Sequence, residues 1–583
     1  MNARARYRLL PWLLVVIGSV ACCTRLEKGS DVFEDGVAGS ASGSGAGVGA
    51  SGGGAVGSQP NETGGQAGTP ALGAPGAGAP TAMLAEGGGA GAGAVETLGG
   101  AGGAETDCLD PQGFDGRGCY SCEPTDVETL ENACSDATCV WFDNARRVPA
   151  VVDGELPELP ALAAVGGSGG SGGSAGSGGG GAGSGGSGGF ACDSLATSGT
   201  VVYVTGSSAA KPFLQQIAQQ LALQQVYLIY TGVGSCTGVD AIVNGTLMRT
   251  GAAPLPTSAT YWDSSSSTGK ACVLPAAGVA ADLGISDVFA PSCPGFEFAN
   301  LETQRIRDAH GPIQTMTFAV AINSKYREIS QQAAYMLFGF GKDGGVLDEE
   351  GKHAIWNDEN GILQRGPSSG TQAMLAAAIG VPSERWKGKL FKSSDDIAAA
   401  LQAASATQAE ADATIGIIGA DYIDSRNLRA QIRVLAYQDS SQACAVSPDS
   451  TDTAKDKRNV RDGHYPIWGP LHLLYKVNGQ GEPANAGIRD TLLNIVGYLS
   501  GSKALPNGVS LIDVYAQSGL VPECAMRVAR VADGGAIVPT SPAAPCSCLF
   551  EKKATGSTAC RSCKVLGDCS AGQTCSRGYC EQP

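Results

Sequence analysis

The sequence of 583 residues has little histidine and less positive than negative charge. Its four histidines are too few to favour a metal site built on imidazole ligands, so we expect no metal. Lys and Arg together number 39 against 55 Asp and Glu, which gives a net charge of −16 at pH 7. Because nucleic-acid phosphates are neutralised by clustered Lys and Arg, this balance argues against DNA or RNA as a partner.

Long apolar runs are also scarce. The apolar run over residues 9–20 is too short to span a bilayer, and no later stretch reaches about 18 consecutive apolar residues. Arginines before this run and small residues after it are typical of a secretory signal peptide over residues 1–22. Ser19–Cys23 resembles a bacterial lipobox with Cys22 as the lipidated residue; Cys23 or a plain export signal are the alternatives. We therefore expect an exported protein, anchored to a membrane by its lipid and facing the periplasm or cell surface.

Glycine is concentrated in two stretches. Of the 86 glycines, 25 lie within residues 36–103 and 16 within residues 166–189. Gly/Ala/Ser-rich segments with few aromatic residues cannot bury a core. We therefore expect a disordered tether over residues 23–105 and a Gly/Ser linker over residues 161–190.

The 20 cysteines fit an oxidising compartment, in which they form disulfides. Five are closely spaced within residues 106–160, and seven lie within residues 541–583. Each segment is too small for a core of its own, so we expect two cross-linked Cys-rich modules. The Cys-x-x-Cys pairs at 119–122 and 560–563 have the spacing of zinc ligands, but export and irregular spacing favour disulfides.

Between these modules, residues 191–540 alternate strand-like and helix-like patterns. Residues 201–204 form a buried strand, and Pro212 suits the first turn of the helix that follows. Residues 226–230 form a second strand, and residues 239–243 continue as a helix. The repeated order of strand, glycine turn and helix predicts an α/β domain with parallel strands. Ligands bind such domains where strand ends meet helix starts.

Three loops that leave these strands are rich in small hydrogen-bond donors. They span residues 206–211, 232–235 and 365–371. Each loop leads into a helix whose first N–H groups have no partner within the helix. Such N–H groups at helix starts bind anions. Arg365 adds a planar fork that suits an oxyanion.

The order of these loops resembles that of the phosphate-binding proteins of bacterial phosphate ABC transporters, the PstS type. The segments that match the family, in chain order, are residues 206–212, 232–238, 285–287, 319–323, 365–371, 415–419 and 465–467. The resemblance implies the two-lobed, hinge-closing fold of the type II periplasmic binding proteins over residues 191–540. One lobe would contain residues 200–312 and 471–538, and the other residues 313–470. Strands near 317–322 and 468–474 would cross between them and act as a hinge.

Carried over position by position, the resemblance implies phosphate contacts from eight residues: Ala210, Lys211, Ser235, Asp287, Arg365, Ser369, Gly370 and Thr371. Hydroxyl and backbone N–H groups would donate to phosphate oxygens, and Arg365 would pair with the dianion. Asp287 would accept a hydrogen bond from the P–OH group of hydrogenphosphate, a bond that fully ionised sulfate cannot form. No cofactor is implied.

The chain also departs from the family pattern. Pro367 stands where the family usually carries Asp, which leaves Arg365 without its orienting partner, and Lys211 stands where the family has Phe. Cys236 lies beside Ser235, and the sequence leaves open whether it pairs with Cys272 or Cys293.

The function that these features favour is capture of phosphate, or a related oxoanion, as the binding component of a phosphate ABC transporter with its permease. An enzyme is not expected. The Ser208-x-x-Lys211 pattern of penicillin-recognising acyl enzymes is present, but no Ser-Asp-Asn or Lys-Thr-Gly follows it. The Cys-rich modules and long tethers leave one alternative, a surface-displayed adhesion or sensor protein that keeps the binding fold without transport.

Overall fold

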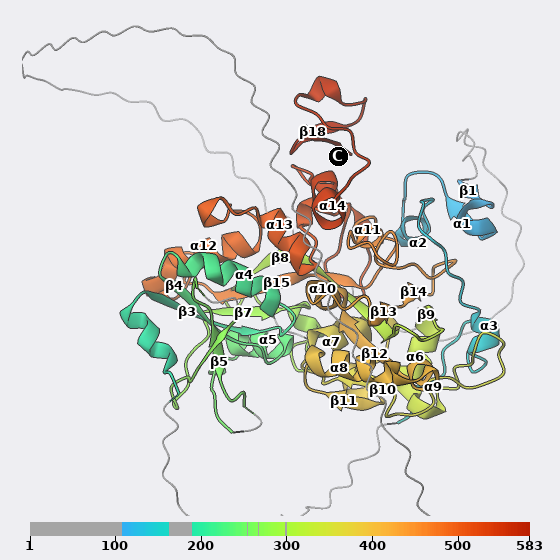
Figure 1. The fold of residues 1–583 in the computed structure, drawn as a ribbon, viewed down its shortest axis with the longest axis horizontal. Helices are drawn as coiled ribbons and strands as arrows, with labels where there is room; N and C mark the ends of the chain where they lie inside the picture. Colours follow the sequence, from blue (N-terminus) through green and yellow to red (C-terminus); the bar gives the residue numbers. More distant parts are fainter. Residues whose placement is uncertain (1–107, 162–188, 253–254, 266–267, 298–299, 583) are drawn as a thin grey trace, which may run out of the picture. The chain divides into compact units, whose positions relative to one another are not determined.

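The computed structural model describes residues 108–161, 189–252, 255–265, 268–297 and 300–582 (Figure 1). The expected signal peptide with Cys22, the tether over residues 23–105 and most of the linker lie outside the described residues. Within the described residues, no helix combines the length and the apolar character needed to cross a membrane.

The first lobe is a parallel α/β layer with an antiparallel edge. β3 lies between β4 and β7 and runs parallel to both, whereas the short strands β5 and β6 extend the edge beyond β4. Its strands are β3 (Thr200–Gly206), β4 (Val226–Thr231), β5 (Ala259–Tyr261), β6 (Lys270–Cys272) and β7 (Leu283–Ser286). Its helices are α4 (Lys211–Ala222), α5 (Ser235–Val243), α12 (Arg489–Leu499) and α13 (Leu511–Ser518).

The second lobe repeats this plan. β10 lies between β11 and β12 and runs parallel to both, and helices pack on the resulting layer. Its strands are β9 (Glu328–Ser330), β10 (Ile362–Arg365), β11 (Lys389–Phe391), β12 (Ile415–Gly419), β13 (Ile432–Val434) and β14 (Ala436–Gln438). Its helices are α6 (Gln331–Phe340), α7 (Gly370–Ile379), α8 (Ser394–Ala403), α9 (Gln408–Ala413), α10 (Ala420–Ser425) and α11 (Arg458–Arg461).

Two long antiparallel strands, β8 (Ile306–Ala321) and β15 (Trp468–Lys476), join the two lobes. β15 pairs with β7 of the first lobe, and β8 pairs with β12 and β13 of the second, so one 11-stranded sheet runs through both. Two α/β layers joined by two crossing strands are the architecture of a type II periplasmic binding protein, which confirms the predicted fold class.

The passage between the lobes lies earlier in β8 than the expected 317–322. Thr315 is the last residue of β8 that pairs with β15, and Met316 is the first that pairs with β12. Because β8 is one unbroken strand, no turn residue marks this change of partner in the sequence.

Nine disulfides join the 18 cysteines of the described residues, which confirms the preference for disulfides over zinc. Cys236 pairs with Cys293, which settles the two alternatives left open by the sequence. The remaining pairs are Cys108–Cys122, Cys119–Cys134, Cys139–Cys444, Cys192–Cys272, Cys524–Cys546, Cys548–Cys560, Cys563–Cys575 and Cys569–Cys580.

Both Cys-rich segments are fastened to the lobes. The N-terminal segment holds β1 (Leu109–Asp110), β2 (Cys119–Tyr120), α1 (Gly113–Gly116), α2 (Val127–Glu131) and α3 (Asn144–Arg147). Its Cys139 is bonded to Cys444, and the Arg147 guanidinium forms a buried ion pair with Glu328. The C-terminal segment follows β16 (Val528–Ala529) and β17 (Val538–Pro539), and holds α14 (Ser547–Thr555), β18 (Thr574–Ser576) and β19 (Tyr579–Glu581).

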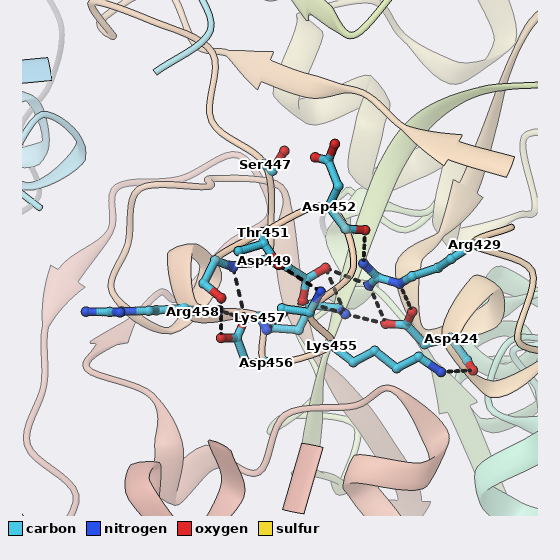
Figure 2. A network of polar contacts seen from close by, with 12 residues as sticks. Asp424, Arg429, Ser447, Asp449, Thr451, Asp452, Lys455, Asp456, Lys457 and Arg458 are labelled. Carbon is cyan, nitrogen blue, oxygen red and sulfur yellow. Dashed lines mark hydrogen bonds and ion pairs between the residues drawn. The ribbon is translucent and has the colours of Figure 1, made fainter. Parts of the chain in front are cut away.

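The second lobe encloses a network of buried charges between α10 and α11 (Figure 2). The Lys457 side chain is fully buried, and its Nζ donates to Asp424 and, at 3.1 Å, to Asp449 Oδ1. Arg429 donates to the same two carboxylates, at 2.9 Å to Asp424 Oδ2 and 2.6 Å to Asp449 Oδ2. Burial raises the pKa of Asp424, but the charges of Lys457 and Arg429 outweigh it, so that pKa lies below its usual value.

Replacing Lys457→Met is expected to destabilise the protein by about 3–5 kcal/mol, because two buried carboxylates would then face a single arginine. Urea unfolding followed by circular dichroism measures this loss.

Lys455→Met is the matched control, two residues away. Lys455 Nζ donates to the Asp424 carbonyl and to Asn427 Oδ1, and this residue is not fully buried. Its loss should cost less than about 1 kcal/mol. Equal losses in both variants would contradict the role assigned to burial.

Candidate anion-binding site

Three helices begin where the two lobes meet. α4 begins at Lys211 after β3, α5 at Ser235 after β4, and α7 at Gly370 after β10. The first N–H groups of each helix have no partner within the helix. We call the contact between residues 232–236 and 366–371 the lobe seam; across it, the Cys236 N–H donates to the Ser368 carbonyl at 3.2 Å.

Two glycines allow the backbones to meet this closely. Gly234 has φ +124°, and a Cβ there would lie 2.7 Å from the Ser368 carbonyl oxygen. A Cβ at Gly370 would lie 2.3 Å from Ser235 Oγ and 2.7 Å from Asp287 Oδ2. The start of α7 in the second lobe therefore rests directly on Ser235 and Asp287 of the first.

Asp287 follows β7 and is only 3% exposed. Ser235 Oγ donates to Asp287 Oδ2 at 2.8 Å and accepts from the Asp287 N–H at 3.3 Å. Asp287 Oδ1 is buried and makes no hydrogen bond within the part of the chain that the structure describes. Burial raises the pKa of Asp287, opposed by the hydroxyls of Ser207 and Ser235 and by the charge of Arg365. Asp287 is therefore a desolvated carboxyl with one free acceptor oxygen at the lobe seam.

Arg365 ends β10 and is 5% exposed. Its Nη1 donates to Ser394 Oγ at 2.8 Å and its Nη2 to the Lys392 carbonyl at 3.2 Å, whereas Nε is buried without a partner among the described residues. Ser394 and Lys392 thus orient the guanidinium, in place of the Asp partner that the resemblance led us to expect where Pro367 stands. Burial lowers the pKa of Arg365, although the charge of Asp287 favours the ionised form.

A cavity of about 290 Å³ opens beside the lobe seam and has walls from both lobes. Lys211, at the start of α4, is exposed and lines this cavity, whereas Ser235 and Asp287 do not. The residues that line it include Ser208, Lys211, Tyr230 and Gly232 of the first lobe, and Ser393, Ser394, Tyr422 and Arg426 of the second.

The other sequence-predicted residues lie at the same helix starts. Ala210 is the buried N-cap of α4, and its N–H donates to Ser207 Oγ at 3.3 Å. Ser369 is the N-cap of α7, makes no side-chain cap, and donates its N–H to the Gly366 carbonyl at 2.9 Å. Thr371 is buried in the first turn of α7. The structure thus brings Ser235, Asp287 and Gly370 into contact, while the Ser235 hydroxyl proton is directed to Asp287.

Asp421 was not expected at this site. It lies in the first turn of α10, with Oδ1 buried and unpaired among the described residues. Burial, followed by the charge of Asp287, raises its pKa to about 8. No sequence pattern indicated this position, because it depends on the parallel pairing of β12 with β10, which brings the loop after Gly419 to the same sheet edge as Arg365.

Asp421→Asn is expected to stabilise the protein at pH 8 and to have a much smaller effect at pH 5. The native pKa of about 8 exceeds the unfolded value, so the native state holds an extra proton and wild-type stability falls as pH rises from about 4 to 8. A neutral amide removes this fall of about 1.4 kcal/mol per pH unit, so the stability of Asp421→Asn relative to the wild type should rise by about 4 kcal/mol from pH 5 to pH 8, or by several degrees in Tm. Thermal unfolding at both pH values checks the result.

Asp490→Asn is the control, since Asp490 also lies in a first helical turn, that of α12, but is exposed. It should leave the pH dependence unchanged. A stability slope in Asp421→Asn identical to that of the wild type would contradict the protonated state of this carboxyl.

No protein-family model and no curated protein matches the sequence. Similar solved structures include an ABC-type phosphate transport receptor from Vibrio cholerae, 12% identical over 55% of this chain and 99% of that one, with a TM-score of 0.33. A phosphate-binding protein from Stenotrophomonas maltophilia is 14% identical over 55% of this chain and 90% of that one, with a TM-score of 0.32. The reduced OxyR regulatory domain from Pseudomonas aeruginosa is 10% identical over 51% and 95%, with a TM-score of 0.27. Similarity at this level does not indicate which ligand the chain binds.

Proposed function

We propose that the protein is an exported solute-binding protein that captures phosphate, or a related oxoanion, at the lobe seam. The observation that carries the proposal is the buried Ser235–Asp287 pair with its free Oδ1 beside the start of α7. An unpaired buried acceptor costs free energy unless a donor reaches it. The P–OH group of hydrogenphosphate is such a donor, and it comes with oxygens that accept from helix N–H groups.

The remaining groups of the site suit the rest of the anion. The starts of α5 and α7 supply N–H donors from opposite lobes, and Arg365 supplies a buried positive charge with an unused Nε. The Ser235 hydroxyl donates to Asp287 and holds it in place, so Ser235 would contact the anion through its backbone N–H group. Sulfate lacks a proton for Asp287, so the same carboxylate would repel it.

Binding would act on the relation between the two lobes. Ser235 and Asp287 belong to the first lobe, and residues 365–371 belong to the second. An anion that contacts both favours the closed arrangement over any open one, with β8 and β15 as the flexing connection. Opening of the lobe seam is then the step that admits and releases the anion.

The setting of this domain is part of the proposal. Residues 1–22 would direct export, Cys22 would carry the lipid, and residues 23–105 and 161–190 would act as spacers around the Cys-rich module of residues 106–160. The two-lobed domain of residues 191–540, followed by the module of residues 541–583, would deliver phosphate to the permease of an ABC transporter.

Titration calorimetry of the full chain with phosphate, arsenate and sulfate tests the proposal. We expect saturable phosphate binding at micromolar Kd or tighter, and weaker binding of sulfate. Asp287→Asn should reduce the preference for phosphate over sulfate by roughly 10- to 100-fold, because the charged acceptor for P–OH is lost and repulsion of sulfate disappears. Arg365→Ala should weaken all three anions.

Asp282→Asn is the matched control, because Asp282 comes directly before β7 and Asp287 directly after it. Its carboxylate accepts from the Tyr203 N–H and from Asn485 and lies outside the lobe seam. This variant should keep the anion preference. A chain that binds none of the three anions would favour the display or sensor alternative, and an unchanged preference in Asp287→Asn would remove Asp287 from the site.

A further inference from the structure

A second cluster of polar side chains lies on the crossing strands. His310 of β8 and His472 of β15 are direct cross-strand partners, so their side chains lie on the same face of the sheet. Asp308 precedes His310 by two residues and therefore shares that face. The antiparallel register thus gathers two of the four histidines and one carboxylate at one place.

The three side chains are close enough to share one ion. His472 Nδ1 and Asp308 Oδ2 lie 2.8 Å apart, and the two imidazole ring centres lie 5.1 Å apart. One donor atom from each of Asp308, His310 and His472 lies within 4.8 Å of the others. Ligands of a zinc ion at about 2.0–2.2 Å from the metal fall within such separations.

One carboxylate oxygen of this cluster lacks a partner. His472 has no exposed side-chain surface, and its Nδ1, which faces Asp308, is the nitrogen that it can offer to an ion shared with that carboxylate. Asp308 Oδ1 is buried and makes no hydrogen bond among the residues that the structure describes. A simple structural His–Asp pair would be expected to satisfy this oxygen, since most buried polar atoms have a partner.

The cluster is open on one side and covered on the other. His310 lines a cavity of about 360 Å³, which gives an ion an entry path and room for a water ligand. Phe289 covers the cluster, with its ring centre 4.3 Å from that of His472.

We propose that Asp308, His310 and His472 form a zinc-binding site on the crossing strands. Two imidazole nitrogens and a carboxylate oxygen are ligands that Zn²⁺ accepts, and water from the cavity would complete the coordination. The site is separate from the anion site of the proposed function and does not depend on it. The low histidine content had led us to expect no metal site. Composition gives the number of histidines, but it does not show which of them the strand register brings together.

Titration of the full chain with ZnCl₂ in phosphate-free buffer tests this site. We expect one saturable Zn²⁺ per chain, and we expect His310→Ala to weaken binding by at least about 100-fold, since even outer-shell substitutions cost 10- to 100-fold. Asp308→Asn should weaken binding as well. Substitution with Co²⁺ should give a visible absorption band that His310→Ala removes.

His353→Ala is the matched control, because the exposed His353 has its Nδ1 2.9 Å from Oδ2 of the buried Asp348, without a second histidine. It should bind Zn²⁺ as the wild type does. Circular dichroism confirms that each variant is folded; the exposed His310 is chosen over the fully buried His472 for this reason. Absence of saturable Zn²⁺ binding in the wild type, or equal affinity in wild type and His310→Ala, would overturn the proposal.

Discussion

The antiparallel pairing of β8 with β15 is the constraint on which the rest of the structure depends. Each lobe contributes its own parallel layer, and these layers are continuous only through this pair. β15 also holds β7 in register, with His472 opposite Ser286, and so fixes where the chain leaves β7 at Asp287. A shift of the pairing by one residue would turn each side chain to the other face and would dissolve both clusters described above.

The lobe seam concentrates buried charge that the fold itself does not fully satisfy. Asp287, Arg365 and Asp421 are all nearly inaccessible, and each keeps one polar atom unpaired among the described residues. By contrast, the Asp424–Lys457 network of the second lobe pairs its charges with one another. Buried polar groups without hydrogen-bond partners at a contact between lobes are typical of a ligand-binding site. Networks in which every charge is paired are typical of structural stabilisation.

Local patterns in the sequence were sufficient for the α/β class and for the helix starts that lie at the lobe seam. Pro212 near the start of α4 and the apolar run of β3 are decided by neighbouring residues, and the structure forms both elements where they were expected. Gly234 and Gly370 were part of the predicted loops, and both are required by close backbone approach at the lobe seam.

What escaped prediction depends on contacts between distant segments. Ser394 replaces the missing partner of Arg365 from a different helix, and Asp421 reaches the lobe seam only because β12 lies beside β10. The pairing of His310 with His472 depends on a strand register between segments more than 160 residues apart in the sequence. The choice of Cys293 as the partner of Cys236 also depends on packing between separate segments, which are 57 residues apart. No motif encodes such encounters, because they follow from the packing of the whole domain.

The disulfide between Cys139 and Cys444 has a consequence for biogenesis. It closes a loop of 305 residues, so in a chain made from its N-terminus Cys139 cannot reach its partner until most of the second lobe has been synthesised. Cys192, Cys236, Cys272 and Cys293 all emerge in the meantime as competing thiols. The native bond therefore forms late, either from a Cys139 thiol that is still free or by disulfide exchange with an earlier pair, so its yield depends on the capacity for thiol–disulfide exchange where the chain folds.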